Sequence, residues 1–117
     1  MTLAHIIKKL NMKMLTAGKD FEAITPTAGY ASDMLSRVMA CAPRDGALWV
    51  TLQSHGNIVA VGAVLGLSAI IITEGEKPDQ ETVAKANEMG ITLLATERPT
   101  FEVVGRLWSM GLRCGER

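Results

Sequence analysis

The second half of the sequence alternates short apolar runs with longer amphipathic runs, and this alternation restricts the fold more than any other feature. The short runs are continuous and rich in β-branched residues, as in buried strands, whereas the longer runs repeat their apolar positions at helical spacing. Strands separated by helices form a parallel sheet with helices on its faces. The predicted strands are 47–52, 69–73 and 91–95, and the predicted helices are 57–65, 80–89 and 101–110.

Residues at the ends of these helices agree with the boundaries. Asp79 stands where an N-cap is needed before the second helix, and Gly90 is suited to end it in a left-handed conformation. Thr100 is the expected N-cap of the third helix, and Gly111 is its expected end. The apolar stripe of the third helix consists of Phe101, Val104, Leu107 and Trp108.

The first half of the chain has weaker patterns. Thr2 is placed to cap a short helix, and two short strands are expected at 12–15 and 22–24. Ser32 is the expected N-cap of a further helix that a proline ends, with Asp33 at the positive end of the helix dipole. The apolar positions of the N-terminal helix are Leu3, Ile6, Ile7 and Leu10.

Together these elements predict an α/β domain of three layers, with a mainly parallel sheet of about four to five strands flanked by helices. A chain of 117 residues has room for one such domain, and 48% hydrophobic residues are enough for its core. Within the single domain 1–117, residues 1–26 form an N-terminal helix and short strands, 27–111 the core, and 112–117 a tail.

Charge and composition exclude several classes of partner. The 12 Lys and Arg balance the 12 Asp and Glu without a basic run, so we expect no nucleic-acid binding. The most apolar stretch, 58–72, is too short to span a membrane. Two widely separated cysteines make no disulfide framework, and the N-terminus lacks the apolar length of a signal peptide. We therefore expect a cytoplasmic protein.

No catalytic constellation stands out. The sequence contains no Walker-type phosphate loop, no dinucleotide-binding glycine motif and no nucleophile elbow. The histidines His5 and His55 share no metal-ligand spacing with Cys41 or Cys114, so we expect neither a metal nor another cofactor. An enzyme that uses His55 or Glu74 as a base is the weakest of the alternatives.

The carboxyl ends of the three predicted strands define a candidate binding edge, because ligands of open parallel sheets bind there beside helix N-termini. Gly56 permits close backbone approach, Asn57 is suited to cap the following helix, and His55 offers a donor, an acceptor or a charge. The same residue types are also ordinary in caps and turns. The candidate ligand-binding residues are Ser54, His55, Gly56, Asn57, Thr73, Glu74, Gly75 and Thr96.

Gly62 and Gly66 lie on the almost wholly apolar helix 57–65 and just beyond it. A helix that is apolar all round must be covered on all sides. A second subunit that packs on these two glycines would do this and make a homodimer. Alternatively, the N-terminal helix covers the helix, and the glycines only admit close internal packing.

Residues from about 28 to 111 resemble a DRTGG domain. Ser54-His55-Gly56-Asn57 stands where the family often has an Asp-Arg-Thr type of loop, and Thr73-Glu74-Gly75 stands where it has Thr-Gly-Gly. The segments that carry the resemblance are 29–36, Thr51 with 57–60, 70–75 and 100–104.

The resemblance implies a regulatory module that is related to the N-terminal domain of HPr kinase/phosphorylase and stands alone without the kinase domain. An HPr serine kinase activity is not expected, because the phosphate loop of the kinase belongs to the missing domain. DRTGG domains also occur beside CBS domains in some pyrophosphatases and in some phosphotransacetylases, where a regulatory role for adenine nucleotides is suggested.

Two functions follow as expectations. The first is a non-catalytic ligand-sensing module, a homodimer that binds an adenine nucleotide or another anionic metabolite at the carboxyl edge of the sheet. The second is an accessory protein that docks on a redox enzyme of the hydrogenase type, or on a phosphotransfer enzyme, without a small-molecule ligand. A polar cleft favours the first function, and an exposed apolar patch favours the second.

Overall fold

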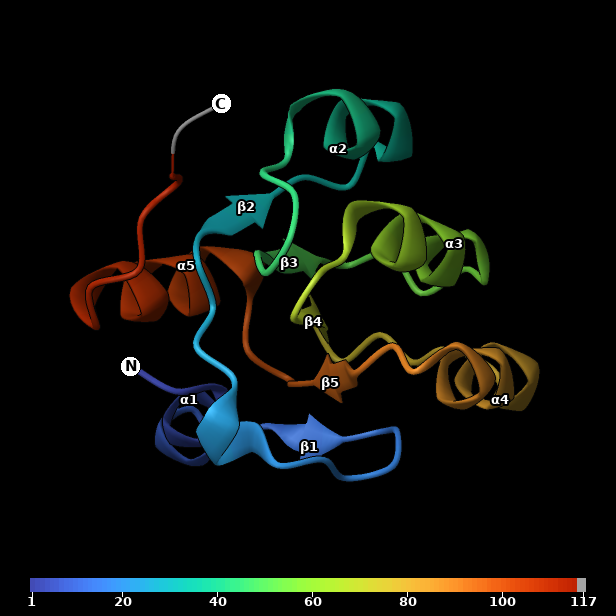
Figure 1. Cartoon of the computed structure of the whole chain (residues 1–117), viewed down its shortest axis with the longest axis horizontal. Helices are drawn as coiled ribbons and strands as arrows, with labels where there is room; N and C mark the ends of the chain where they lie inside the picture. Colours follow the sequence, from blue (N-terminus) through green and yellow to red (C-terminus); the bar gives the residue numbers. More distant parts are fainter. Residues whose placement is uncertain (116–117) are drawn as a thin grey trace.

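The computed structural model describes residues 1–115, which form one five-stranded sheet with helices on both faces (Figure 1). The strands are β1 (Lys13–Met14), β2 (Gly29–Ala31), β3 (Leu48–Thr51), β4 (Ala69–Ile72) and β5 (Leu93–Ala95). The helices are α1 (Leu3–Lys9), the 3₁₀ turn η1 (Phe21–Ala23), α2 (Leu35–Cys41), α3 (Asn57–Leu65), α4 (Gln80–Met89) and α5 (Thr100–Ser109).

The sheet has the order β1-β5-β4-β3-β2. Strands β2 to β5 are parallel to one another, and β1 pairs with β5 in the antiparallel sense. The predicted α/β class and the mainly parallel sheet are confirmed. The N-terminal segment 1–26 contributes β1 to the same sheet as the core segment.

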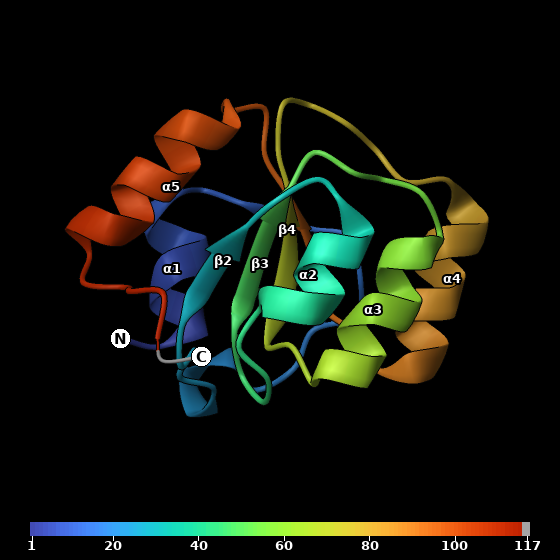
Figure 2. The same cartoon turned by 90° about the horizontal axis from the view of Figure 1, so that it is seen from above.

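Each helical connection from β2 to β5 leads to the neighbouring strand in the same direction. Because such crossovers are right-handed, the three connecting helices must lie on one face of the sheet. Helices α2, α3 and α4 do lie together on that face, and α1 and α5 lie on the other (Figures 1 and 2). The result is the predicted three-layer arrangement.

Strands β3 and β4 are buried along their whole length, because each is covered on both faces. Their side chains alternate between two hydrophobic clusters, one on the α1–α5 side and one on the α2–α4 side. Leu48, Val50 and Ile71 belong to the first cluster, and Trp49 and Ile70 to the second. This burial on both sides explains the continuous apolar runs in the sequence.

Helix α3 lies between α2 and α4, which pack along its two sides. The prediction that the N-terminal helix covers α3 is wrong, since α1 lies on the opposite face of the sheet (Figure 2). This packing, together with the sheet, buries Ile58, Val59, Val61 and Leu65 of α3. None of the helices within residues 1–115 is long and apolar enough to cross a membrane.

Several helix caps occur where the sequence places them. The side chain of Thr2 accepts a hydrogen bond from the His5 N–H at the start of α1. The carboxylate of Asp79 accepts one from the Thr82 N–H at the start of α4, and Gly90 ends that helix with φ of 70°. Short polar side chains at these positions satisfy N–H groups that the helix cannot.

Several local predictions are wrong. Neither Thr100 nor Asn57 is an N-cap, because each is the first residue of its helix, after Pro99 and Gly56. Residues 22–24 do not form a strand, because 21–23 wind into η1. Ser32 is not the N-cap of α2, which begins two residues later than expected; its hydroxyl accepts instead from the Met34 N–H. The stripe of α5 is also out of phase, because Val103 and Leu107 are buried whereas Phe101 and Trp108 are exposed. In addition, β2 was not predicted.

Candidate functional site

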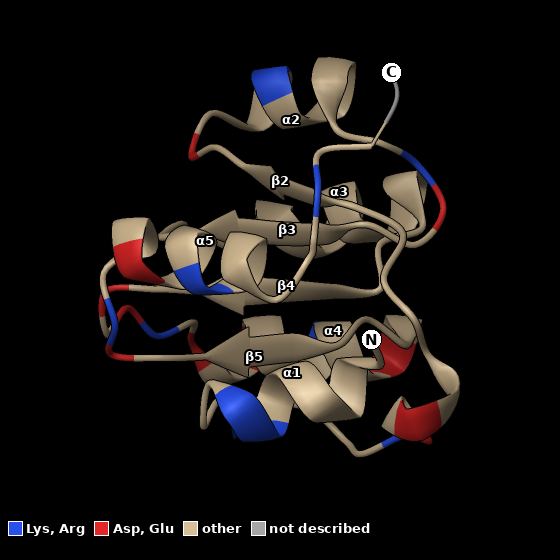
Figure 3. Cartoon of the chain, turned by 90° about the vertical axis from the view of Figure 1, so that its left-hand side faces the viewer, with Lys and Arg blue, Asp and Glu red and all other residues tan. Residues whose placement is uncertain are grey.

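The loops that follow β3, β4 and β5 meet at the carboxyl edge of the sheet, as the parallel order requires. The loops after β4 and β5 carry both acidic and basic residues (Figure 3). The candidate ligand-binding residues come from these loops and from the start of α3. The structure shows which of their polar groups are free to meet a ligand.

The turn Thr73-Glu74-Gly75 braces the loop between β5 and α5. Glu74 and Gly75 both have positive φ, of 62° and 73°. Their N–H groups donate to the carbonyls of Arg98 and Thr96 at 2.9 and 3.1 Å. Thr73 is fully buried, and its hydroxyl bonds to that of Thr100 at 2.6 Å. The backbone donors of this turn are therefore used inside the protein.

Three of the helices that start at this edge, α3, α4 and α5, already have a side-chain acceptor for an N–H of the first turn. His55 Nδ1 accepts from the Asn57 N–H at 3.1 Å, and Glu74 Oε2 accepts from the Thr100 N–H at 2.8 Å. Asp79 caps α4, and the hydrogen bonds from the backbone and side chain of Thr82 hold the pKa of Asp79 below its usual value. His55 and Glu74, the two candidate bases, thus each accept one hydrogen bond from an N–H at the start of a helix, although neither is the N-cap residue.

His55 and Gly56 line an open cavity of about 610 Å³ between α3 and α4. A side chain at Gly56 would come within 3.3 Å of the Thr82 hydroxyl, so this glycine permits the close approach of α3 and α4. Ser54 is half-buried in the preceding loop, and Asn57 is exposed at the start of α3. We call this space the α3–α4 cavity.

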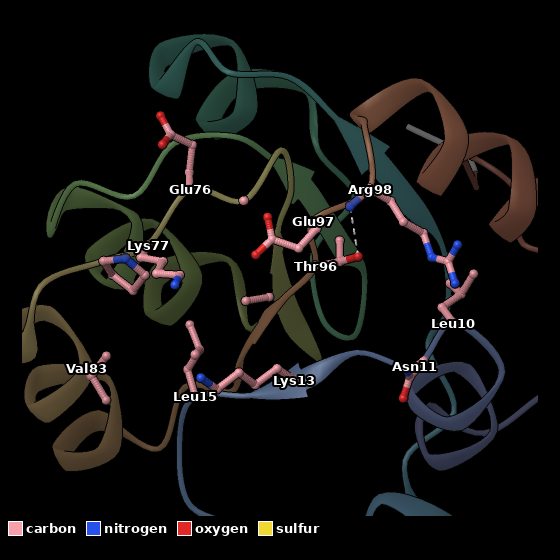
Figure 4. A pocket seen from close by; sticks show the side chains of 13 residues that line it. Leu10, Asn11, Lys13, Leu15, Glu76, Lys77, Val83, Thr96, Glu97 and Arg98 are labelled. Carbon is pink, nitrogen blue, oxygen red and sulfur yellow. Dashed lines mark hydrogen bonds between the residues drawn. The ribbon is translucent and has the colours of Figure 1, made fainter.

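A second cavity of about 430 Å³ opens between β1, the β4–α4 loop and the β5–α5 loop (Figure 4). Of the candidate residues, Gly75 and Thr96 line it. We call it the β5 cavity. The eight candidate residues do not converge on one site, because Gly75 and Thr96 line the β5 cavity whereas His55 and Gly56 line the α3–α4 cavity. The residues that line the β5 cavity are Leu10, Asn11, Lys13, Leu15, Gly75, Glu76, Lys77, Pro78, Val83, Ala95, Thr96, Glu97 and Arg98.

The charged side chains around the β5 cavity differ in whether they point into the cavity or pair elsewhere in the chain. The guanidinium of Arg98 turns away and pairs with Glu102 at 2.8 Å, and this hydrogen bond holds the pKa of Glu102 below its usual value. The side chains of Lys13, Lys77 and Glu97 extend towards the space between β1 and the β4–α4 loop (Figure 4). Sequence reasoning missed these three residues; Lys13 could not be placed here because β1 pairs with β5 only in the folded chain.

Gly62 and Gly66 have roles inside the protein. Gly62 is buried, and a Cβ there would lie 3.1 Å from Ile70 Cδ1 and 3.3 Å from Ile91 Cγ2. Gly66 ends α3 in the left-handed conformation, with φ of 66°. Both positions are explained by packing within one chain, and a dimer through them remains a prediction.

Within residues 1–115, no three His, Cys, Asp or Glu side chains are grouped so that they could hold a metal ion. What the edge offers is an apolar hollow with a few charged groups on its rim. This composition is typical of sites that bind small molecules.

The fold and this hollow define an α/β domain with a candidate ligand site at the carboxyl edge of its sheet. The chain belongs to the DRTGG domain family, whose model matches residues 5–110. The resemblance found in the sequence is confirmed, and the matched region also includes most of the N-terminal segment.

A solved structure with the same fold is that of the CBS and DRTGG domains of the regulatory region of Clostridium perfringens pyrophosphatase, complexed with the activator diadenosine tetraphosphate. The two chains share 20% sequence identity with a TM-score of 0.73. The match covers 97% of this chain and 48% of the other, so this chain spans about half the length of its neighbour. No significant match was found among curated proteins.

Proposed function

We propose that this DRTGG domain is a regulatory module that senses an adenine nucleotide or another anionic metabolite at the carboxyl edge of its sheet. Its family and its structural neighbour support this role, since the neighbour is a regulatory region bound to a nucleotide activator. We propose the sensing role without catalysis, and the hydrogen bonds that His55 and Glu74 accept from helix N–H groups support a structural role for these two candidate bases.

The observation that carries the proposal is the β5 cavity. Its volume of about 430 Å³ lies within the range of small-molecule sites, which run from about 300 to 1,000 Å³. Its walls combine apolar side chains with a few charged groups, as such sites generally do. The α3–α4 cavity is more open and is lined mainly by charged and polar side chains.

A ligand in the β5 cavity would connect parts of the chain that are distant in sequence. The walls come from the end of α1, from β1, from α4 and from the loops after β4 and β5. Strand β1 pairs with β5 over only two residues, so β1 is the wall of the cavity whose position could change most easily. Binding would tie these elements together and stabilise the folded chain.

Docking on a redox or phosphotransfer enzyme is the second candidate, and one observation favours a contact surface. Phe101, Val104 and Trp108 on α5 are 91%, 37% and 51% exposed, which is unusual for large apolar side chains on one helix face. The comparisons with known proteins lend no support to such a partner, so the sensing role is the one we propose.

Two measurements test the proposed function. Native mass spectrometry of the purified protein should reveal any ligand that co-purifies. Isothermal titration calorimetry with AMP, ADP, ATP and diadenosine tetraphosphate should give saturable binding by at least one of them. If the titrations show no heat of binding at millimolar nucleotide, and the nucleotides do not change the melting temperature of the protein, the proposal is contradicted.

A further inference from the structure

Two lysines enter the β5 cavity from different elements. Lys13 lies on β1, opposite Ala95 of β5, and Lys77 lies in the β4–α4 loop. Both side chains are exposed and extend towards the same space (Figure 4). Within residues 1–115, neither ammonium group forms an ion pair, whereas the neighbouring Arg98 does. The cavity therefore contains two ammonium groups that, among the described residues, have no carboxylate within ion-pair distance.

Two like charges at one cavity repel each other, and an anion bound between them would attract both and offset this repulsion. A lysine ammonium is a compact point charge with three donors, which suits the oxygens of a phosphate group. The guanidinium of Arg98 points away from the cavity and pairs with Glu102 (Figure 4). The lysines are thus the groups of this cavity suited to bind a phosphate.

Glu97 supplies the opposite kind of group. Its carboxylate extends into the same space and lies against Gly75, where any side chain would collide with it (Figure 4). A carboxylate accepts hydrogen bonds and donates none, so it repels phosphate oxygens and attracts an amino group. Glu76, the other acidic residue of the lining, points away from the cavity (Figure 4).

Apolar side chains complete the lining between these charged groups. Leu10, Leu15 and Val83 come from α1, β1 and α4, and they offer a surface for the flat face of a base or another apolar ring. The cavity therefore combines a cationic group for phosphate, a carboxylate for an amino group and an apolar wall.

We propose that Lys13 and Lys77 bind the phosphate of a nucleotide with an amino group on its base, and that Glu97 accepts a hydrogen bond from this amino group. The inference rests on the proposed sensing function and deepens it, because it names the cavity and the parts of the ligand that are recognised. An adenine nucleotide has both features, whereas an inosine nucleotide lacks the amino group.

The test is calorimetric titration of the whole chain with AMP, IMP and adenosine. In K13Q and K77Q, the affinity for AMP should fall roughly tenfold each, with little change for adenosine. In E97Q, the preference for AMP over IMP should shrink by a similar factor. The matched control is K85Q, which removes an exposed lysine from the α3–α4 cavity and should leave the affinity for AMP unchanged. Melting curves confirm that each variant is folded.

The possible outcomes separate this inference from the proposed function. Wild-type binding that survives in K13Q, K77Q and E97Q but is weakened in K85Q would place the ligand in the α3–α4 cavity. That result overturns the inference and leaves the sensing role intact. Undiminished discrimination against IMP in E97Q would refute the role of Glu97. Wild-type protein that binds none of the nucleotides would contradict the proposed function itself, and the inference with it.

Discussion

Asp33 ties the loop between β2 and α2 to the end of β3, and its removal should be costly. Its Oδ1 accepts hydrogen bonds from the Thr51 hydroxyl and from the Leu52 N–H, both at 2.8 Å. Thr51 is fully buried, whereas Asp33 itself is exposed. The change Asp33→Ala removes both bonds and leaves the buried hydroxyl of Thr51 without this acceptor.

The size of the effect follows from these contacts. A hydrogen bond to a charged group contributes about 1.5–3 kcal/mol, and a buried hydroxyl that loses its acceptor costs about 1–3 kcal/mol. Because the carboxylate of Asp33 is exposed, solvent screening reduces both values. We expect a total loss of about 2 kcal/mol in the free energy of unfolding. The change Asp33→Asn keeps an oxygen at the same position and should lose about half as much.

Urea denaturation measures this loss as a lower midpoint at an unchanged slope, by roughly 1 M for a domain of this size. A double-mutant cycle with Thr51→Val should give a coupling energy of about 1 kcal/mol for the bond between the two side chains. The control is Glu76→Ala, which removes an exposed carboxylate that points away from the β5 cavity. If Asp33→Ala is as stable as this control, the reasoning is refuted.

Three further predictions concern stability and assembly. Because its hydrogen bonds with Thr82 lower the pKa of Asp79, this cap stabilises the fold above about pH 4 and loses its effect as the pH falls through the lowered pKa. The melting temperatures of wild type and Asp79→Ala should therefore differ near neutral pH and converge as the pH falls through the lowered pKa; a constant difference would contradict the assignment. Gly62→Val should destabilise the chain by about 2 kcal/mol in urea, because its Cβ would press on Ile70 and Ile91, whereas Gly105→Ala, at an open position on α5, should stabilise it by about 0.5–1 kcal/mol. For assembly, light scattering at micromolar concentration should report about twice the 12.6 kDa chain mass, and a monomer would reject the predicted homodimer.

The sequence was sufficient for the part of the fold in which local signals and burial agree. Strands β3 and β4 are continuous apolar runs, and the predicted bounds of α3 and α4 are those of the structure. Caps such as Asp79 and Gly90 are local devices, so they can be identified without tertiary information.

Strand β2 and η1 could not be predicted, because their conformations depend on distant neighbours. The three residues Gly29–Ala31 have little strand propensity of their own and are held by pairing with β3. Conversely, 22–24 was expected to be a strand but pairs with no strand of the sheet, and 21–23 form η1. Asp33 also seemed to be a local helix residue, although its partners lie at the end of β3.

The candidate site was predictable in position and not in detail. A parallel sheet places the loops after β3, β4 and β5 at one edge whatever their sequence. Which of their N–H groups remain free depends on contacts such as those of Glu74 and Gly75 with the β5–α5 loop. The lysine of β1 joins the edge only because β1 pairs with β5, a contact that no sequence pattern indicated.

The central claim is that an adenine nucleotide binds in the β5 cavity, and NMR spectroscopy of ¹⁵N-labelled protein titrated with AMP tests it most directly. The account predicts saturable shifts of the amides of Lys13, Gly75, Lys77 and Glu97, with those of the α3–α4 cavity little changed. A spectrum unchanged at millimolar AMP, or shifts confined to residues around His55, would contradict it.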